Sequence, residues 1–449
     1  MKYNIQNGKI TGKEIRNIIN DHQKEHEHMR KLYERYKASR KGVPIFERSI
    51  MDHDEFGIKG ATRIDDKVNN MLNNAFESDI VDTATGYFLG HPINYQYEGD
   101  AIKKEIDTFN LRNHVEDADS EWGKMAIICG KGARLAYIDK EGNERIKNIE
   151  PWQTIFIGDS IAEPDYSIRY YKDDKGVSHA EFYNDTMIQY FTDKDGTYEE
   201  ETPKPHLFAH NPLYGLANNK EEQGDIEKVL SLIDAYNRTL SDASNEIEQY
   251  RLAYLVFKGI TPDEETNDQM KRHKVIELLE KDDDVSYLTK DINDQLIEHH
   301  LERLEKNILK FAKSVDFTDE QFGSAASGVS LRYKLLALEN KCVTKERKMT
   351  AALRYQFKVI FSAWAKRKGV GKDDYLNVSF SFKRNLPVNV LEESEITANL
   401  RGNVSEETRL AQLSIVANAK EELERMKKEQ DEYMRNMPDV GDGNGSGTD

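Results

Sequence analysis

Apolar residues recur at alternating steps of three and four along three long stretches in the second half of the chain. The stretches cover residues 225–256, 295–313 and about 329–367. This spacing places the apolar side chains on one face of an α-helix, and a helix of about 30 residues is ~45 Å long. The sequence therefore predicts three long helices, each of which buries only a stripe.

The segment between the first two helices predicts a small α/β unit. The runs YLVFKG and VSYLTKDI indicate strands, and VIELLE between them indicates a short helix. Two helices of opposite direction with such a unit between their far ends form a stalk with a tip. Because each helix is apolar along only one stripe, we expect lateral packing against copies of the same chain.

The third helix follows a run of small residues, FGSAASG, at positions 322–328. The run is either a flexible linker or a loop that a rigid support holds out against something that moves. We expect the first half of the helix to be partly solvated and the second half to be deeply packed. The apolar positions of the two halves are Leu331, Leu335, Leu338 and Cys342, then Met349, Leu353, Phe357, Ile360 and Trp364.

The first 211 residues predict helices followed by a sheet. Helices are expected over residues 11–41 and 64–76. Residues 122–211 contain alternating runs such as ARLAYID, YSIRYYK and MIQYFT, which indicate an antiparallel sheet. The turns between these runs end in a glycine that can take the positive φ of a hairpin loop; these glycines are Gly142, Gly176 and Gly196.

The C-terminal part begins after Gly369 and Gly371, which end the third helix. The run NVSFSFKRNLPVN predicts a strand, and residues 405–434 predict a final helix. The tail PDVGDGNGSGTD has the composition of a disordered segment.

Composition excludes some classes of protein. A net charge of −17 argues against a general basic surface that wraps DNA, although it allows nucleic acid to slide past. The two cysteines, Cys129 and Cys342, match no metal or redox spacing, so we expect reduced thiols in a cytoplasmic protein. No apolar run suits a signal peptide or a membrane span, and we expect a soluble protein with no membrane partner.

Candidate chemistry is sparse. His22, His26 and His28 lie on a charged helix, where a solvated face is favoured over a metal site. The run Asp282, Asp283 and Asp284 suits a solvated turn or an acidic docking surface better than a Mg²⁺ site. The sequence has no nucleophile elbow, zinc motif or phosphate-binding loop. We therefore expect no enzymatic activity, no cofactor and no metal.

Five stretches follow one another along the chain in a familiar order: SDIVDTATGYFLGHPINYQ, NNKEEQGDIEKVLSLIDAYN, VSYLTKDI, FGSAASGVSLRYKLLALENKCVTKERK and FSFKRNLPVNVLEES. Together they resemble the portal proteins of tailed bacteriophages, the family typified by siphoviruses of Gram-positive hosts. The resemblance implies an elongated α+β subunit that assembles, commonly as about twelve copies, into a ring at one capsid vertex. DNA is packaged through the axial channel of such a ring and later ejected through it.

The resemblance also assigns the parts of the chain. It implies a wing with N-terminal helices at residues 1–224, stem helices at 225–256 and 292–314, a clip at 257–291, a tunnel loop at 315–330, a tunnel helix at 331–369, a wing return at 370–404, and a crown helix with a disordered tail at 405–449.

The same resemblance assigns functional residues. The loop that faces DNA comprises Phe317, Phe322, Gly323, Ser324, Ala325, Ala326, Ser327 and Gly328. Basic rings on the tunnel helix are an open alternative, and they would comprise Lys334, Lys341, Lys345, Arg347 and Lys348. Docking at the clip is expected to involve Asp282, Asp283 and Asp284.

The implied partners are other copies of the chain, the terminase large subunit, the head–tail adaptor, the major capsid and scaffolding proteins, and double-stranded DNA in the channel. The implied location is the portal vertex of the virion, after assembly in the host cytoplasm. The alternative function is a coiled-coil scaffold that has no DNA channel, since two or three paired chains also satisfy long amphipathic helices.

Overall fold

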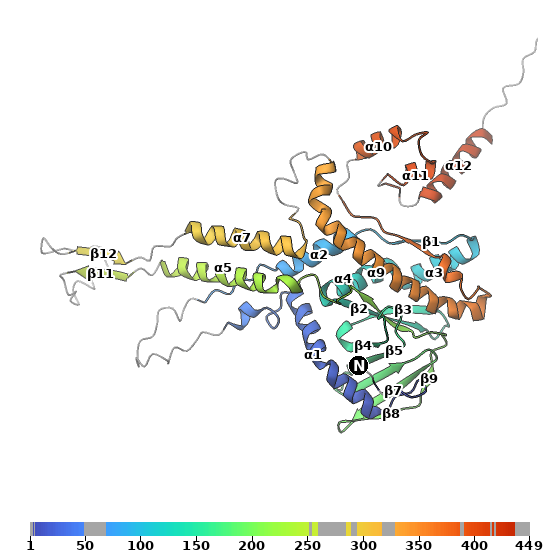
Figure 1. Ribbon diagram of the computed structural model, residues 1–449, viewed down its shortest axis with the longest axis horizontal. Coiled ribbons are helices and arrows are strands. Elements are labelled where there is room, and N and C mark those ends of the chain that lie inside the picture. Colours follow the sequence, from blue (N-terminus) through green and yellow to red (C-terminus); the bar gives the residue numbers. More distant parts are fainter. Residues whose placement is uncertain are drawn as a thin grey trace, which may run out of the picture. The chain divides into compact units, whose positions relative to one another are not determined.

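The computed structural model contains helices and sheets in two compact units (Figure 1). It describes residue 3 and residues 5–48, 69–250, 254–258, 284–288, 294–316, 328–386, 390–413, 415–416 and 419–435. One unit combines Met1–Thr85 with Phe109–Leu376, and the other combines Gly86–Thr108 with Asn377–Asp449. The expected α+β class is confirmed.

Helix α1, Gly12–Tyr36, begins as the sequence predicts and ends at Tyr36 rather than at residue 41. Its N-cap residue Thr11 accepts a hydrogen bond from the backbone N–H of Glu14, which satisfies one of the free donors at the helix start. The apolar face of α1 packs on the core of a six-stranded sheet; its residues there are Ile15, Ile18 and Ile19.

The six-stranded sheet is antiparallel throughout, and a three-stranded sheet accompanies it. The larger sheet contains β4 (Thr154–Ile157), β5 (Tyr166–Lys172), β6 (Ser178–Tyr183), β7 (Met187–Lys194), β8 (Thr197–Glu200) and β9 (Lys204–Pro205). The smaller sheet has the order β10 (Leu213–Ala217), β2 (Lys131–Ile138) and β3 (Glu144–Ile149). The predicted strands are confirmed, and the turn glycines Gly142, Gly176 and Gly196 have φ of 84°, 82° and 82°.

Two predictions about the wing are wrong. Residues 69–75 are not helical, and helix α2, Phe76–Leu89, begins where the predicted helix was to end; residues 64–68 lie outside the described residues. Trp122 lies in helix α4, Val115–Cys129, so the β-rich region begins only at β2. Helix α4 and the preceding helix α3, Asp100–Asn113, were not predicted.

Residues 69–75 avoid a helix because their backbone is bound elsewhere. Three alternate N–H groups donate to side-chain oxygens of helix α5, Leu230–Tyr250, at distances of 2.7–3.0 Å. The pairs are Asn70 with Asn245, Leu72 with Ser241, and Asn74 with Asn237. The donors are two residues apart on extended chain, a span of about 6.6 Å. The acceptors are four residues apart on the helix, a span of about 6 Å, so donors and acceptors stay aligned along α5.

The predicted stalk is present as two packed helices, α5 and α7 (Asp294–Ala312). A short 3₁₀ turn, Glu227–Val229, precedes α5. The two predicted strands of the tip are confirmed as β11 (Tyr254–Lys258) and β12 (Asp284–Leu288), which pair antiparallel. The predicted short helix between them, VIELLE, lies outside the described residues.

Helix α9, Gly328–Lys368, is the predicted third helix. Its 41 residues give a length of about 60 Å. Both apolar stripes are buried in the described part of the helix, including Leu335, Cys342 and Phe357. The opposite face of the first half is exposed, with Tyr333 at 74% and Leu336 at 52%. The expectation of a partly solvated first half is thus confirmed for that face only.

The second unit contains a small sheet and short helices. Strand β1 (Asn94–Gln96) pairs with β13 (Ser379–Ser381), so only three residues of the predicted C-terminal strand form one. The helices are α10 (Val390–Asn399), α11 (Glu406–Leu410) and α12 (Ala419–Arg435). The single helix predicted over residues 405–434 is therefore two helices, and the tail lies outside the described residues.

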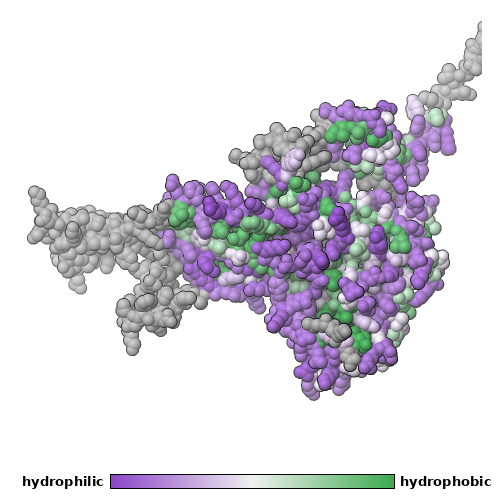
Figure 2. Space-filling model, in the orientation of Figure 1, coloured by the Kyte–Doolittle hydropathy of each residue, from purple (hydrophilic) through white to green (hydrophobic). Residues whose placement is uncertain are grey.

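Three further 3₁₀ turns complete the described structure: Pro44–Glu47, Pro151–Gln153 and Asp374–Asn377. None of the helices in the described part of the chain is long and apolar enough to cross a membrane. Most of the surface in Figure 2 is hydrophilic, and hydrophobic residues are exposed along the paired helices α5 and α7. Two of these residues are Ile247, 61% exposed, and Phe311, 53% exposed.

Candidate functional site

Most residues of the predicted DNA-facing loop lie outside the described residues. Phe317, Phe322, Gly323, Ser324, Ala325, Ala326 and Ser327 belong to this group, as do Asp282 and Asp283 of the predicted docking surface. Gly328 is the first residue of α9, and Asp284 is the first residue of β12, opposite Lys258. Among the described elements, α9 follows the predicted loop directly in the sequence.

A buried cluster of charges holds the first half of α9. The carboxylate of Asp225 accepts a hydrogen bond from the ammonium group of Lys345 at 2.7 Å and forms an ion pair with the ammonium group of Lys341 at 2.9 Å. It also accepts from the side-chain amide of Asn218 at 2.8 Å. Lys341 donates in addition to the carbonyl oxygen of Ala312, the last residue of α7, at 2.9 Å. These residues form the Asp225 cluster, which joins α9 to the roots of both stem helices.

Burial and neighbouring charges shift the pKa values of Asp225 and Lys345 in opposite directions. Burial alone would raise the pKa of Asp225, but Lys345 and Lys341 outweigh it and hold that pKa well below its usual range. Burial lowers the pKa of Lys345, and the Asp225 carboxylate opposes that change. The ion pairs therefore keep the carboxylate ionised in a site where an isolated charge would be very costly.

The Asp225 cluster includes two of the lysines considered for basic rings. Lys345 is 4% exposed and the side chain of Lys341 is 12% exposed, and both ammonium groups lie beside the Asp225 carboxylate. Lys334 and Lys348 are half-buried, and Arg347 is exposed. The sequence carried a signal for this arrangement, because Lys345 lies three residues after Cys342 and four before Met349, in line with the buried stripe.

A second buried cluster holds the other half of α9. Arg134 of β2 is fully buried and donates to Asp119 of α4 at 2.7 Å and to Gln356 of α9 at 2.8 Å. Its guanidinium lies 4.0 Å from the ring centre of Trp122, a cation–π geometry. The hydroxyl of Tyr214 also donates to Gln356, at 3.0 Å. This Arg134 cluster fixes α9 on the three-stranded sheet.

A third cluster fixes the start of the stem. Arg35 of α1, 2% exposed, donates to Glu77 of α2 at 2.9 Å and to Asp234 of α5 at 2.6 Å. The Glu77 carboxylate is completely buried. Because a buried charge needs a paired and hydrogen-bonded partner, this cluster fixes the directions of three helices together.

The prediction of a solvated face for the histidines of α1 is wrong for His22 and His26, which pack against the sheet, and is confirmed for His28. His22 is 6% exposed, and its Nδ1 lies 2.8 Å from the hydroxyl of Tyr170. His26 Nδ1 donates to the carbonyl oxygen of Trp152 at 2.8 Å. Burial lowers the pKa of His22 to about 4, so its imidazole is neutral near pH 7. Only His28 is exposed, beside Glu227 at 3.0 Å.

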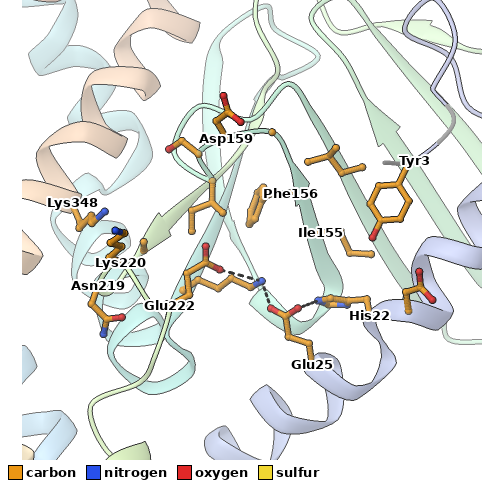
Figure 3. A pocket seen from close by; sticks show the side chains of 17 residues that line it. Tyr3, His22, Glu25, Ile155, Phe156, Asp159, Asn219, Lys220, Glu222 and Lys348 are labelled. Atoms are coloured by element: carbon orange, nitrogen blue, oxygen red, sulfur yellow. Dashed lines mark hydrogen bonds and ion pairs between the residues drawn. The ribbon is translucent and has the colours of Figure 1, made fainter. Parts of the chain in front are cut away.

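A hollow of about 600 Å³ lies between α1, the β4–β5 connection and residues 219–222 (Figure 3). Lys131, buried at its edge, forms ion pairs with Glu25 and Glu222, and Lys348 of α9 also lines the hollow. The two carboxylates compensate the charge of Lys131, so that residue does not form an anion site. Within the described residues, no group of three or more His, Cys, Asp or Glu side chains is arranged to hold a metal ion.

The described arrangement is mechanical. A buried ion pair with Asp225 holds α9 beside α5 and α7, and buried hydrogen bonds from Arg134 and Tyr214 to Gln356 hold it on the three-stranded sheet. Helix α9 is consequently held in both of its halves.

Comparison with known proteins agrees with this architecture. The chain matches the family described as phage portal protein, SPP1 Gp6-like, over residues 15–436. It is 26% identical over 423 residues to the portal protein of Bacillus phage SPP1, covering 87% of this chain and 82% of that protein. It is 24% identical over 367 residues to the portal protein of Clostridium phage phiCD119, covering 74% of this chain and 79% of the relative.

The family match includes most of α1, the sheets, α5, α7, α9 and all of α12. Such a match extends over almost the whole chain. The chain therefore belongs to the SPP1 Gp6-like family of phage portal proteins, which are structural components of the virion at the capsid vertex.

Proposed function

We propose that this portal protein forms a closed ring of about twelve subunits whose channel carries double-stranded DNA during packaging and ejection. In this proposal α9 is the tunnel helix, and residues 315–330 form the tunnel loop that contacts the DNA. The observation that carries the proposal is the family match over residues 15–436, in which α9 and both stem helices lie. A coiled-coil scaffold is not favoured, because that match extends well beyond the helices.

The composition of the loop supports its role. Gly323, Ser324, Ala325, Ala326, Ser327 and Gly328 are small and uncharged, which suits a segment that must change shape beside a moving polyanion. Phe317 and Phe322 flank them and supply larger contact groups. The support is rigid, since the Asp225 and Arg134 clusters both anchor α9.

Replacing Gly323 and Gly328 together by valine is expected to reduce DNA packaging while ring assembly stays intact. A β-branched residue restricts the backbone, and the freedom that glycine allows is worth roughly 0.5–1 kcal/mol per position. The measurement is packaged DNA per procapsid in a terminase-driven assay, with ring formation checked by electron microscopy. Gly86→Val is the matched control, because a Cβ at Gly86 meets no atom within 4 Å. Unchanged packaging would remove the loop from the mechanism.

The clip is proposed to bind first the terminase large subunit and then the head–tail adaptor. The acidic run Asp282, Asp283 and Asp284 leads into β12, and an acidic run attracts basic partners. Changing all three to lysine is expected to weaken both complexes at low salt, as measured by pull-down of each partner. Asp174→Lys, on an exposed hairpin of the six-stranded sheet, is the control for a charge reversal of the same kind elsewhere on the surface. Equal capture of both partners by the triple variant would contradict the assignment.

The remaining assignments complete the proposal. The wing and the crown are proposed to face the major capsid and scaffolding proteins, and assembly is proposed to take place in the host cytoplasm. No catalytic role is proposed for any residue.

A further inference from the structure

The Asp225 cluster has a composition that stability alone does not require. One carboxylate is shared by two ammonium groups, and Asp225 and Lys345 are both buried. Lys341 and Lys345 lie four residues apart on α9, where like charges destabilise an isolated helix. A pair of apolar side chains would fill such a site at least as stably. The ionic arrangement therefore calls for an explanation in terms of geometry.

The cluster meets three elements at their ends. Asp225 lies just before the turn that leads into α5, and Ala312 is the last residue of α7. The carbonyl of Ala312 is at the negative end of the α7 dipole, which favours the ammonium of Lys341. Lys341 thus forms an ion pair with Asp225, which precedes α5, and a hydrogen bond with the last residue of α7.

A long stretch of α9 separates the Asp225 cluster from the segment that precedes the helix. Gly328, where α9 begins, precedes Lys341 by 13 residues, or about 20 Å of helix. Of the described side chains between them, Leu335 and Leu338 are buried, whereas Tyr333 and Leu336 are exposed. Apolar packing tolerates sliding, because it is non-directional. The hydrogen bonds of Lys345 to Asp225 and of Lys341 to Ala312 are directional, so they set the axial and rotational position of this part of α9.

We propose that Asp225, Lys341 and Lys345 form a coupling joint that makes the first half of α9 and the two stem helices move as one body. A displacement of the segment before Gly328 is then transmitted to the roots of α5 and α7, and in the reverse direction as well. The consequence for DNA rests on the proposed function, whereas the joint itself can be tested without DNA.

The test compares the thermal stability of each variant with how uniformly α9 is positioned relative to α7. Asp225→Asn leaves two ammonium groups with no anion, so its subunit is expected to be less stable than the wild type. The double variant Asp225→Leu with Lys345→Met replaces the buried pair by apolar groups, while Lys341, whose side chain is 12% exposed, keeps its hydrogen bond to the carbonyl oxygen of Ala312. This variant is expected to keep a thermal midpoint close to the wild type. Lys348→Met, on the same helix but outside the cluster, is the matched control.

The position of α9 relative to α7 is measured as the distribution of distances between two spin labels. The labels are placed on Asn340→Cys of α9 and Lys306→Cys of α7, both exposed positions. The native cysteines, Cys129 and Cys342, are buried and do not compete for label. Labelled subunits are diluted with unlabelled ones so that each ring carries one pair.

The wild type and Lys348→Met are expected to give one narrow distance. The stable double variant is expected to lose that single distance and to show a broad or divided distribution. If the double variant keeps the same narrow distance between the two labels, the proposed coupling joint is contradicted, whatever the packaging assay gives. A broadened distance with normal packaging would support the joint and would count against the proposed role of α9 in DNA movement.

Discussion

Arg134→Met is expected to lower the free energy of unfolding by about 3–5 kcal/mol, because it leaves a buried carboxylate without its partner. The side chain of Asp119 is 3% exposed, and Arg134 is its ion-pair partner at 2.7 Å. The same substitution removes a donor from Gln356 of α9 and the cation that stacks on Trp122. Chemical denaturation of the purified protein, followed by circular dichroism, measures the change.

Two variants make this prediction specific. Arg145→Met, on the neighbouring strand β3, removes a half-buried arginine that donates to the carbonyl oxygen of Arg112 at 2.9 Å, and it is expected to lower the free energy of unfolding by about 1 kcal/mol. Adding Asp119→Leu to Arg134→Met removes the unpaired charge and is expected to recover much of the loss. A single Arg134→Met variant within about 1 kcal/mol of the wild type would contradict the view that this cluster anchors α9.

Ile247→Asp is expected to prevent ring closure. Ile247 continues the apolar stripe of α5 toward the tip, yet it is 61% exposed in the single subunit, whereas Ile233 near the root is fully buried. If a neighbouring stem covers Ile247, its burial contributes about 1.5–3 kcal/mol. Its loss then weakens each contact by roughly tenfold to a hundredfold. Native mass spectrometry measures the fraction of complete rings.

The controls separate the lost apolar contact from the added charge. Ile247→Met keeps an apolar side chain and is expected to assemble normally. Gln295→Asp places the same charge on an exposed position of α7 and is also expected to assemble. Complete rings from Ile247→Asp would show that neighbouring subunits do not cover this part of the stem.

Features that depend on local chemistry were predicted from the sequence. The hairpins ending in Gly142 and Gly176 follow from alternating runs and from the need for positive φ. The second half of α9 follows from a regular apolar period, and its residues Met349, Leu353 and Phe357 are all fully buried. In both cases the information lies within a few residues of the element itself.

The helix predicted over residues 64–76 was wrong because its partner is distant in the sequence. The backbone of Asn70, Leu72 and Asn74 bonds to side chains of α5 that lie 163–175 residues away. Tertiary hydrogen bonds of this kind override helical propensity. The sequence of residues 69–75 alone does not predict them.

The buried lysines show the same limit at the candidate site. Lysine is almost never fully buried without a partner, so an exposed basic ring was the natural interpretation of Lys341 and Lys345. The partner, Asp225, precedes Lys345 by 120 residues. Periodicity alone placed Lys345 in the buried stripe, but only the fold identified the carboxylate that makes this position tolerable.

We propose that the subunits close into a ring in which α9 supports a loop at the channel wall. Electron cryomicroscopy of the purified assembly tests this arrangement most directly. The expected result is a closed ring of about twelve subunits, with residues 317–328 at the channel wall and the Asp225 cluster intact in every subunit. A ring in which this segment faces outward, or particles of two or three subunits paired only through α5 and α7, would contradict it.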